Sequence, residues 1–187
     1  MTRTPQLDEA VAHALRAPSV HNTQPWRWRI DNAEGVVELY ADRGRQLAAT
    51  DPDGRDLLIS CGAALGHLAV ALAHQGRQAT TLRFPDPDNT AHLATVRVEA
   101  TPGADTAALA ALFPAIHRRH TDRRRFSHRP VPPGLIHDMI DAAGRADVVL
   151  HPVPTRPRTL RRRPGRAADL QRWTPGYPAE LQIWTRR

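Results

Sequence analysis

One segment constrains the fold more than any other: the apolar run 57–76, "LLISCGAALGHLAVALAHQG". Its length, its many alanines and leucines and its lack of proline predict a helix. Because apolar side chains lie on nearly every side, we expect a central helix that is buried all round. Asp53 or Asp56 is expected to cap the start of this helix, and Gly76 to end it.

Small residues inside this helix bear on its packing. Gly62 and Gly66 form a GxxxG pattern, which is typical of helices that another element approaches closely. Cys61 is the single cysteine of the chain, so the sequence contains no disulfide framework and no thiolate metal cluster. Its place in an apolar helix indicates a packing role rather than a nucleophilic one.

Other patterns predict helices and hairpin strands on both sides of the central helix. Helical spacing begins at residue 7 and ends before Pro18, and residues 31–35, "DNAEG", indicate a turn between two strands. The mixture predicts an α+β fold. The expected helices are 7–16, 104–120 (through Pro114), 134–146 and 178–187, and the expected strands are 26–30, 36–41, 79–84, 92–100 and 147–153.

Length and charge restrict the partners. A chain of 187 residues is enough for one domain or slightly more. The formal net charge is +7, but residues 1–150 hold 17 arginines and 17 acidic residues, whereas residues 151–187 hold nine arginines and two acidic residues. The basic excess therefore lies in the tail, and nucleic-acid binding is not favoured. We expect no membrane span, no signal peptide and a cytoplasmic location.

Two familiar chemistries find little support in the residues. His117 and His120 have a spacing seen in metal ligands, but the sequence indicates no third ligand, so a metal site is not favoured. Ser19 and His21 lie two residues apart without a nucleophile-elbow motif, which argues against a serine hydrolase.

Two segments look like anchors for a small molecule. "RHTDRRRF", residues 119–126, combines arginines with a hydroxyl group and suits a phosphate. "PSVHNTQPW", residues 18–26, offers amides that can both donate to and accept from the edge of a heteroaromatic ring. Together they predict a nucleotide-like ligand. The alternatives are a solvated arginine face and an ordinary polar turn between a helix and a strand.

The same two segments carry a family resemblance. "APSVHNTQPWRW" and "RHTDRRRF" resemble two motifs of the FMN-dependent nitroreductases, in the reverse of the usual order. That order, with "ELYADRGRQLAATDPDGRDLLISCGAAL" between the motifs, resembles the Acg family of actinobacterial nitroreductase-like proteins. The resemblance extends to about residue 154.

The resemblance implies a domain plan and a set of cofactor-binding residues. Acg-like chains resemble two nitroreductase halves fused, so residues 1–101 would be the first half and residues 102–154 the start of the second. One FMN would lie between them. The implied contacts are Pro18, Ser19 and Asn22 from the first half and Arg119, His120, Thr121 and Arg123 from the second, with Gln24 and Trp26 supporting the turn.

The resemblance also implies an activity. NAD(P)H would reduce the flavin, and the flavin would reduce a small-molecule substrate, a nitro compound or a quinone. This chemistry needs no acid or base from the protein, and we identify none. The alternatives are a protein that holds or sequesters flavin without turnover and an inactive truncated product.

Residues 155–187 depart from the family pattern. "TRPRTLRRRPGR", residues 155–166, replaces an alanine-rich, acid-containing helix, and family-like sequence resumes at "AADLQRWTPGYPAEL". A local shift of reading frame would explain the arginines, and resequencing the locus would test it. Family members are also longer, so most of the second half is expected to be missing. An exposed half-core would then favour self-association.

Overall fold

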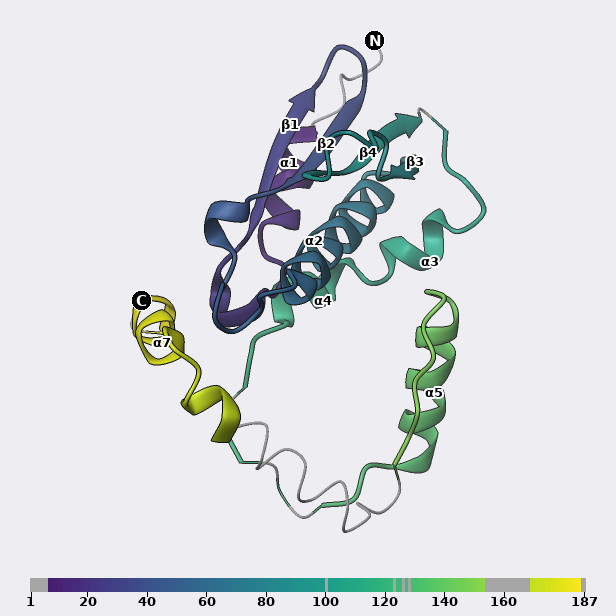
Figure 1. Cartoon of the computed structure of the whole chain (residues 1–187). Helices are drawn as coiled ribbons and strands as arrows, with labels where there is room; N and C mark the ends of the chain where they lie inside the picture. Colours follow the sequence, from purple (N-terminus) through teal and green to yellow (C-terminus); the bar gives the residue numbers. More distant parts are fainter. Residues whose placement is uncertain are drawn as a thin grey trace. The chain divides into compact units, whose positions relative to one another are not determined.

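The computed structural model describes residues 7–99, 101–122, 124–125, 127, 129–153 and 169–185, which fall into two compact units (Figure 1). The first unit contains the chain up to Thr121 together with the segment from Thr174 onward, and the second contains Asp122–Trp173. The predicted boundaries at residues 101 and 154 concern halves of a family fold rather than compact units, and they stay a prediction.

The first unit is built on an antiparallel sheet with the strand order β1-β2-β4-β3. The predicted hairpin is confirmed, because Trp26 pairs with Ala41 and Asp31 pairs with Val36. All four strands expected between residues 26 and 100 are present. They are β1 (Trp26–Asp31), β2 (Val36–Ala41), β3 (Gln78–Arg83) and β4 (His92–Glu99).

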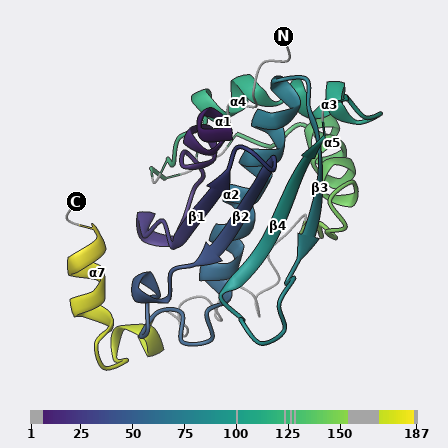
Figure 2. The same ribbon diagram turned by 90° about the horizontal axis from the view of Figure 1, so that it is seen from above.

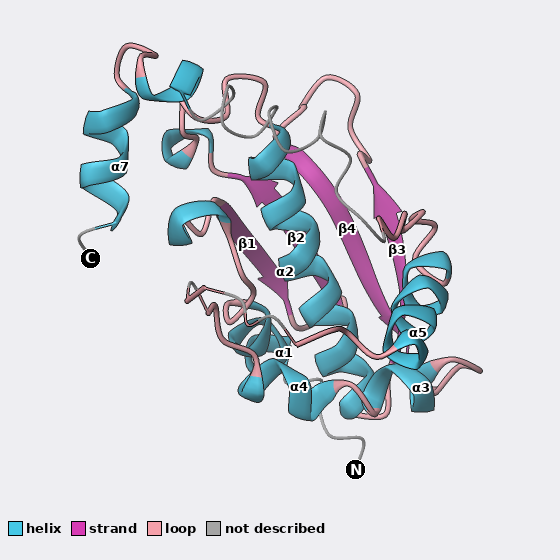
Figure 3. Ribbon diagram, turned by 90° about the horizontal axis from the view of Figure 1, so that it is seen from below, coloured by secondary structure: helices cyan, strands magenta, loops and turns pink. Residues whose placement is uncertain are grey.

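Helices α1 (Leu7–Ala14) and α2 (Arg55–His74) cover one face of this sheet (Figures 2 and 3). Alternate residues of β2 are buried against them, whereas Glu38 and Tyr40 point to the opposite, more polar face. The inward residues are Val37, Leu39 and Ala41. The α+β class predicted from the sequence is thus confirmed.

The ends of α2 depend on residues on either side of it. The carboxylate of Asp51 accepts hydrogen bonds from the backbone N–H groups of Asp56 (3.0 Å) and Leu57 (2.9 Å), so Asp51 caps the helix. The prediction of Asp53 or Asp56 as the cap was wrong, because the intervening turn folds back and brings Asp51 to the helix start. Gly76 has a φ of +74° just after the helix end, as predicted.

The burial predicted for α2 was only half right. One side packs on the sheet and on α1, but Leu58 is 37% exposed and Ile59 is 61% exposed. Gly62 and Gly66 lie on this open side, and a Cβ atom added at either would meet no other atom within 4 Å. In length and composition α2 could cross a membrane, but half of its most apolar stretch is buried inside the domain, as in a core helix.

The helix expected over residues 104–120 is broken in the structure. It divides into α3 (Thr106–Ala110) and α4 (Phe113–Arg118), with Pro114 in the first turn of α4. A proline lacks the N–H that a continuous helix needs, and its ring clashes with the carbonyl four residues earlier. Pro114 is tolerated only because a new helix begins there.

The remaining elements confirm two expectations and overturn one. In the second unit α5 (Pro133–Gly144) matches the helix predicted over 134–146, and in the first unit α7 (Tyr177–Thr185) matches the helix predicted over 178–187. The strand predicted over 147–153 is absent. The described part of the second unit contains no strand with which it could pair, and a strand without a partner leaves its backbone groups unsatisfied.

Candidate functional site

The turn after α1 has a backbone that is unusual for its residue types. It contains the short 3-10 helix η1 (Val20–Asn22). His21, Asn22 and Gln24 have φ values of 45°, 60° and 50°, which lie in the left-handed region although none of them is glycine. Each such residue costs about 1–2 kcal/mol, so surrounding contacts must hold the turn in this shape.

The first of these contacts comes from within the turn. The Oγ of Ser19 accepts a hydrogen bond from the backbone N–H of Gln24 at 2.9 Å. The side-chain amide of Gln24 lies 3.4 Å from Oδ1 of Asn22 and donates to it. Gln24 therefore closes the turn, in agreement with the supporting role predicted for it.

Helix α2 supplies the second set of contacts. Ser60 Oγ accepts a hydrogen bond from the backbone N–H of Val20 (3.2 Å) and donates one to the carbonyl of Asp56 (2.7 Å). Cys61 Sγ donates to the carbonyl of Pro25 at 3.2 Å. Ser60 was not predicted, because nothing in the sequence pairs it with a residue 40 positions earlier.

Cys61 is buried as predicted and is unsuited to act as a nucleophile. Its side chain is 1% exposed. Burial raises the pKa of the thiol to about 12, an effect that outweighs the opposite influence of Arg43. The thiol therefore stays protonated near neutral pH, and its role is to pack and to donate one hydrogen bond.

A third contact comes from the loop after β2, which begins with the 3-10 helix η2 (Arg43–Arg45). Nη1 of Arg45 donates to the backbone carbonyl of Thr23 at 3.0 Å. The backbone N–H of Asp42 donates to the carbonyl of Pro25 at 2.9 Å. Both bonds end on the turn, so this loop also fixes its position.

The arginine segment follows α4, and Arg119 connects it to the turn. The guanidinium Nη2 of Arg119 donates to the carbonyl of Arg16 at 3.3 Å, and Nη1 lies 3.5 Å from the hydroxyl of Thr121. Arg16 stands two residues before Pro18. The structure therefore places Arg119 and Thr121 close in space to the start of the turn, although about a hundred residues separate them in the sequence.

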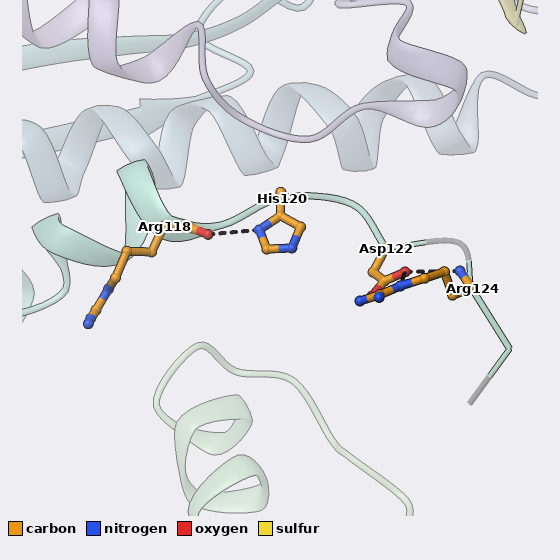
Figure 4. Close-up of polar contacts among 4 residues, drawn as sticks. All are labelled: Arg118, His120, Asp122 and Arg124. Carbon is orange, nitrogen blue, oxygen red and sulfur yellow. Dashed lines mark hydrogen bonds and ion pairs between the residues drawn. The ribbon is translucent and has the colours of Figure 1, made fainter. Parts of the chain in front are cut away.

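The other described residues of the arginine segment are exposed. His120 Nδ1 lies 3.1 Å from the carbonyl of Arg118 (Figure 4). Within the second unit, Asp122 forms a short ion pair with Arg124, with Nη2 and Oδ2 2.6 Å apart, and this guanidinium lowers the pKa of the carboxyl group. Arg123, predicted to bind the cofactor, lies outside the described residues.

Aromatic rings attach α4 to the helices beneath it. Phe113 stacks on His74 with ring centroids 3.8 Å apart, and it meets the edge of His13 at 4.7 Å. His13 also meets His117 at 5.1 Å. Because Arg119 follows α4 directly, these rings help to set the place of the arginine segment.

Burial disfavours the charged form of two histidines beneath α4. It lowers the pKa of His13, an effect that the neighbouring His117 reinforces and Glu9 opposes. It also lowers the pKa of His67, where a hydrogen bond to the backbone of His13 opposes the shift and Arg119 reinforces it. At both positions burial thus favours the neutral imidazole.

In the described ranges, no group of three or more His, Cys, Asp or Glu side chains is placed so that it could hold a metal ion. Of the predicted cofactor residues, Pro18, Ser19 and Asn22 lie in one turn, and Arg119, His120 and Thr121 follow α4. The contact between Arg119 and Arg16 joins the two groups.

Comparison with known proteins shows strong sequence similarity over part of the chain. No family model matches it. It is 51% identical over 140 residues to the "Putative NAD(P)H nitroreductase Rv3131" of Mycobacterium tuberculosis, a match that covers 75% of this chain and 40% of that protein. It is 41% identical over 134 residues to the "Putative NAD(P)H nitroreductase acg" of the same species, covering 70% and 38%.

Among solved structures, the chain is similar to the crystal structure of a nitroreductase family protein from Streptococcus pneumoniae. That match has 15% identity and a TM-score of 0.39, and it covers 70% of this chain and 86% of the other. Of the two curated Mycobacterium tuberculosis relatives, by contrast, the chain spans only about 40% of the length.

Proposed function

We propose that the chain, which belongs with the Acg-type nitroreductases and covers about 40% of their length, forms one side of an FMN-binding site. The site would serve an NAD(P)H-dependent oxidoreductase. The observation that carries the proposal is the bond from Arg119 to the carbonyl of Arg16. This bond sets an arginine and a hydroxyl beside a strained polar turn. A phosphate and a ring system need such a pair of surfaces.

The residues present fit a phosphate on the arginine side. Arg119 is exposed, and its guanidinium carries five N–H groups, of which one bonds the carbonyl of Arg16 and another faces Thr121 at 3.5 Å. The remaining N–H groups can donate to a phosphate in the forked geometry that arginine offers. In this proposal Thr121 and His120 line the same side.

The turn fits the other end of the ligand. Pro18 and Asn22 are exposed on it, and Ser19 is half-buried. The left-handed residues store backbone strain of the kind that occurs at binding sites. Bound FMN would accept a hydride from NAD(P)H and pass reducing equivalents to a small nitro compound or quinone. In this proposal the role of the chain is to bind and orient the flavin.

The test is retention of flavin by the purified full chain. The protein is mixed with FMN, desalted and examined for flavin absorbance, beside an Arg119→Ala, Asn22→Ala double variant. We expect retained flavin that the double variant loses. Arg83→Ala, an exposed arginine at the end of β3, is the matched control and should retain flavin.

Turnover is measured separately, as oxidation of NADPH or NADH in the presence of a nitroaromatic compound. Steady consumption supports the oxidoreductase, whereas bound flavin without consumption supports the alternative of a flavin-holding protein. Failure of a folded chain to retain FMN would overturn the proposal for this chain by itself.

We also propose that a second copy of the chain covers the open face of α2. Leu58 and Ile59 expose apolar surface there, and Gly62 and Gly66 leave room for another helix to approach. The relatives contain more than half their length beyond the matched part, and a second copy of the chain is the occupant that we propose for this face.

A further inference from the structure

The helix α7 (Tyr177–Thr185) is docked through one face, although it lies far from the rest of the first unit in the sequence. Its half-buried residues follow the spacing i, i+3, i+4, i+7 of a single helical face. These residues are Tyr177, Glu180, Leu181 and Trp184, whereas Pro178, Ala179, Gln182 and Ile183 between them are exposed. The middle of the docked face is therefore occupied by a carboxylate.

The carboxylate of Glu180 is bound by three donors of one loop. Oε1 accepts from the backbone N–H of Ala49 at 3.1 Å, and Oε2 accepts from the backbone N–H of Thr50 at 2.9 Å. Oε2 also accepts from the hydroxyl of Thr50 at 2.8 Å. Hydrogen bonds to an ionised acceptor are stronger than neutral ones, and two consecutive backbone donors fix its direction.

The same loop holds the turn of the candidate site. Arg45 in that loop donates to the carbonyl of Thr23 at 3.0 Å. Residues of α7 also lie beside η1 itself. Within the loop, Nε2 of Gln46 donates to the carbonyl of Asp51 at 2.9 Å and so joins the neighbours of Arg45 and Thr50. The contacts therefore lead from Glu180 through this loop to Arg45 and the strained turn.

We propose that Glu180 is a positioning residue: it seats α7 on the loop 47–51 and beside η1, and so keeps the turn Pro18–Gln24 in its left-handed conformation. The turn needs such support, because three of its residues occupy an unfavourable backbone region. The conformational part of the proposal stands on these contacts alone, and its consequence for flavin rests on the proposed function.

The test compares Glu180→Ala and Glu180→Gln in the full chain without FMN, by amide hydrogen exchange. In Glu180→Ala we expect faster exchange in α7, in residues 47–51 and in residues 20–24, with the core strands unchanged. Glu180→Gln keeps one acceptor oxygen and should show a smaller change. Glu34→Ala, an exposed glutamate in the β1–β2 turn, should change none of these segments.

A second variant approaches the contact from the other side. Thr50→Val removes the hydroxyl donor and leaves Glu180 in place, so it should loosen α7 and the turn less than Glu180→Ala does. Faster exchange in α7 with no change at residues 20–24 in every variant would overturn the proposal, because α7 would then be docked without supporting the turn.

Flavin binding provides the readout that depends on the proposed function. If the wild-type chain retains FMN, Glu180→Ala should weaken its binding by roughly tenfold, the loss expected for about one charge-assisted hydrogen bond. If the wild-type chain retains none, the proposed function fails, and the exchange experiment still decides the role of Glu180.

Discussion

Thr23 is fully buried in the middle of the turn, and in the described structure its hydroxyl has no hydrogen-bond partner. Thr23→Val keeps the shape and removes the buried polar atom, so we expect the free energy of unfolding to rise by about 1 kcal/mol. Urea denaturation measures it. Thr95→Val is the control: the Thr95 hydroxyl bonds His92, and its loss should not stabilise the protein.

Individual residues also explain why the site could be predicted only in part. The motif residues 18–26 stand together in the sequence, so a polar turn was predictable. Ser60 and Arg45 bond the turn itself, and Glu180 bonds the loop that carries Arg45. All three lie 22 or more positions away from the residues they bond. A side chain's distant hydrogen-bond partner leaves no local pattern, and for this reason none of the three was identified.

Among the helices and strands, α2 depends on the cap that Asp51 provides. Asp51→Ala removes the acceptor of two backbone N–H groups and a negative charge at the helix start, so we expect a loss of about 1–2 kcal/mol in unfolding free energy. Thermal or urea unfolding measures it. Asp53→Ala, at an exposed position of the same turn, should cost much less. Equal losses would contradict the capping role.

The docking of α4 is expected to weaken in acid. Burial lowers the folded-state pKa of His13 and His67 below the ordinary value of about 6.5, so each contributes stability that is present above that value and is lost as the pH falls through the folded pKa. Unfolding free energy should therefore decline between about pH 7 and pH 5.

Replacing these histidines tests the assignment. His67→Asn removes the titrating group, so the variant should lose less stability over the same pH range than the wild type does. His137→Asn, an exposed histidine of α5, is the control and should keep the wild-type slope. A slope that is equally steep in both variants would assign the effect to other groups.

On the scale of the whole molecule, the open face of α2 is expected to mediate self-association. Ile59→Glu places a charge in the centre of this face, so we expect dimers to shift to monomers in light scattering at equal concentration. Ile183→Glu is the matched control, because Ile183 is 59% exposed on the outward side of α7, whereas Ile59 is 61% exposed. A wild-type chain that is monomeric at high concentration would contradict the proposal.

Local sequence patterns were enough to predict where most helices and strands form, because apolar periodicity, turn residues and Gly76 act over a few positions. Tertiary structure decided the rest. It left one face of α2 open, made Asp51 rather than Asp53 the cap, and brought Arg119 to the carbonyl of Arg16. The segment 147–153 has strand-like residues, but the described part of its unit contains no strand to pair with it. These outcomes depend on which residues distant in the sequence come into contact, and local sequence patterns do not contain that information.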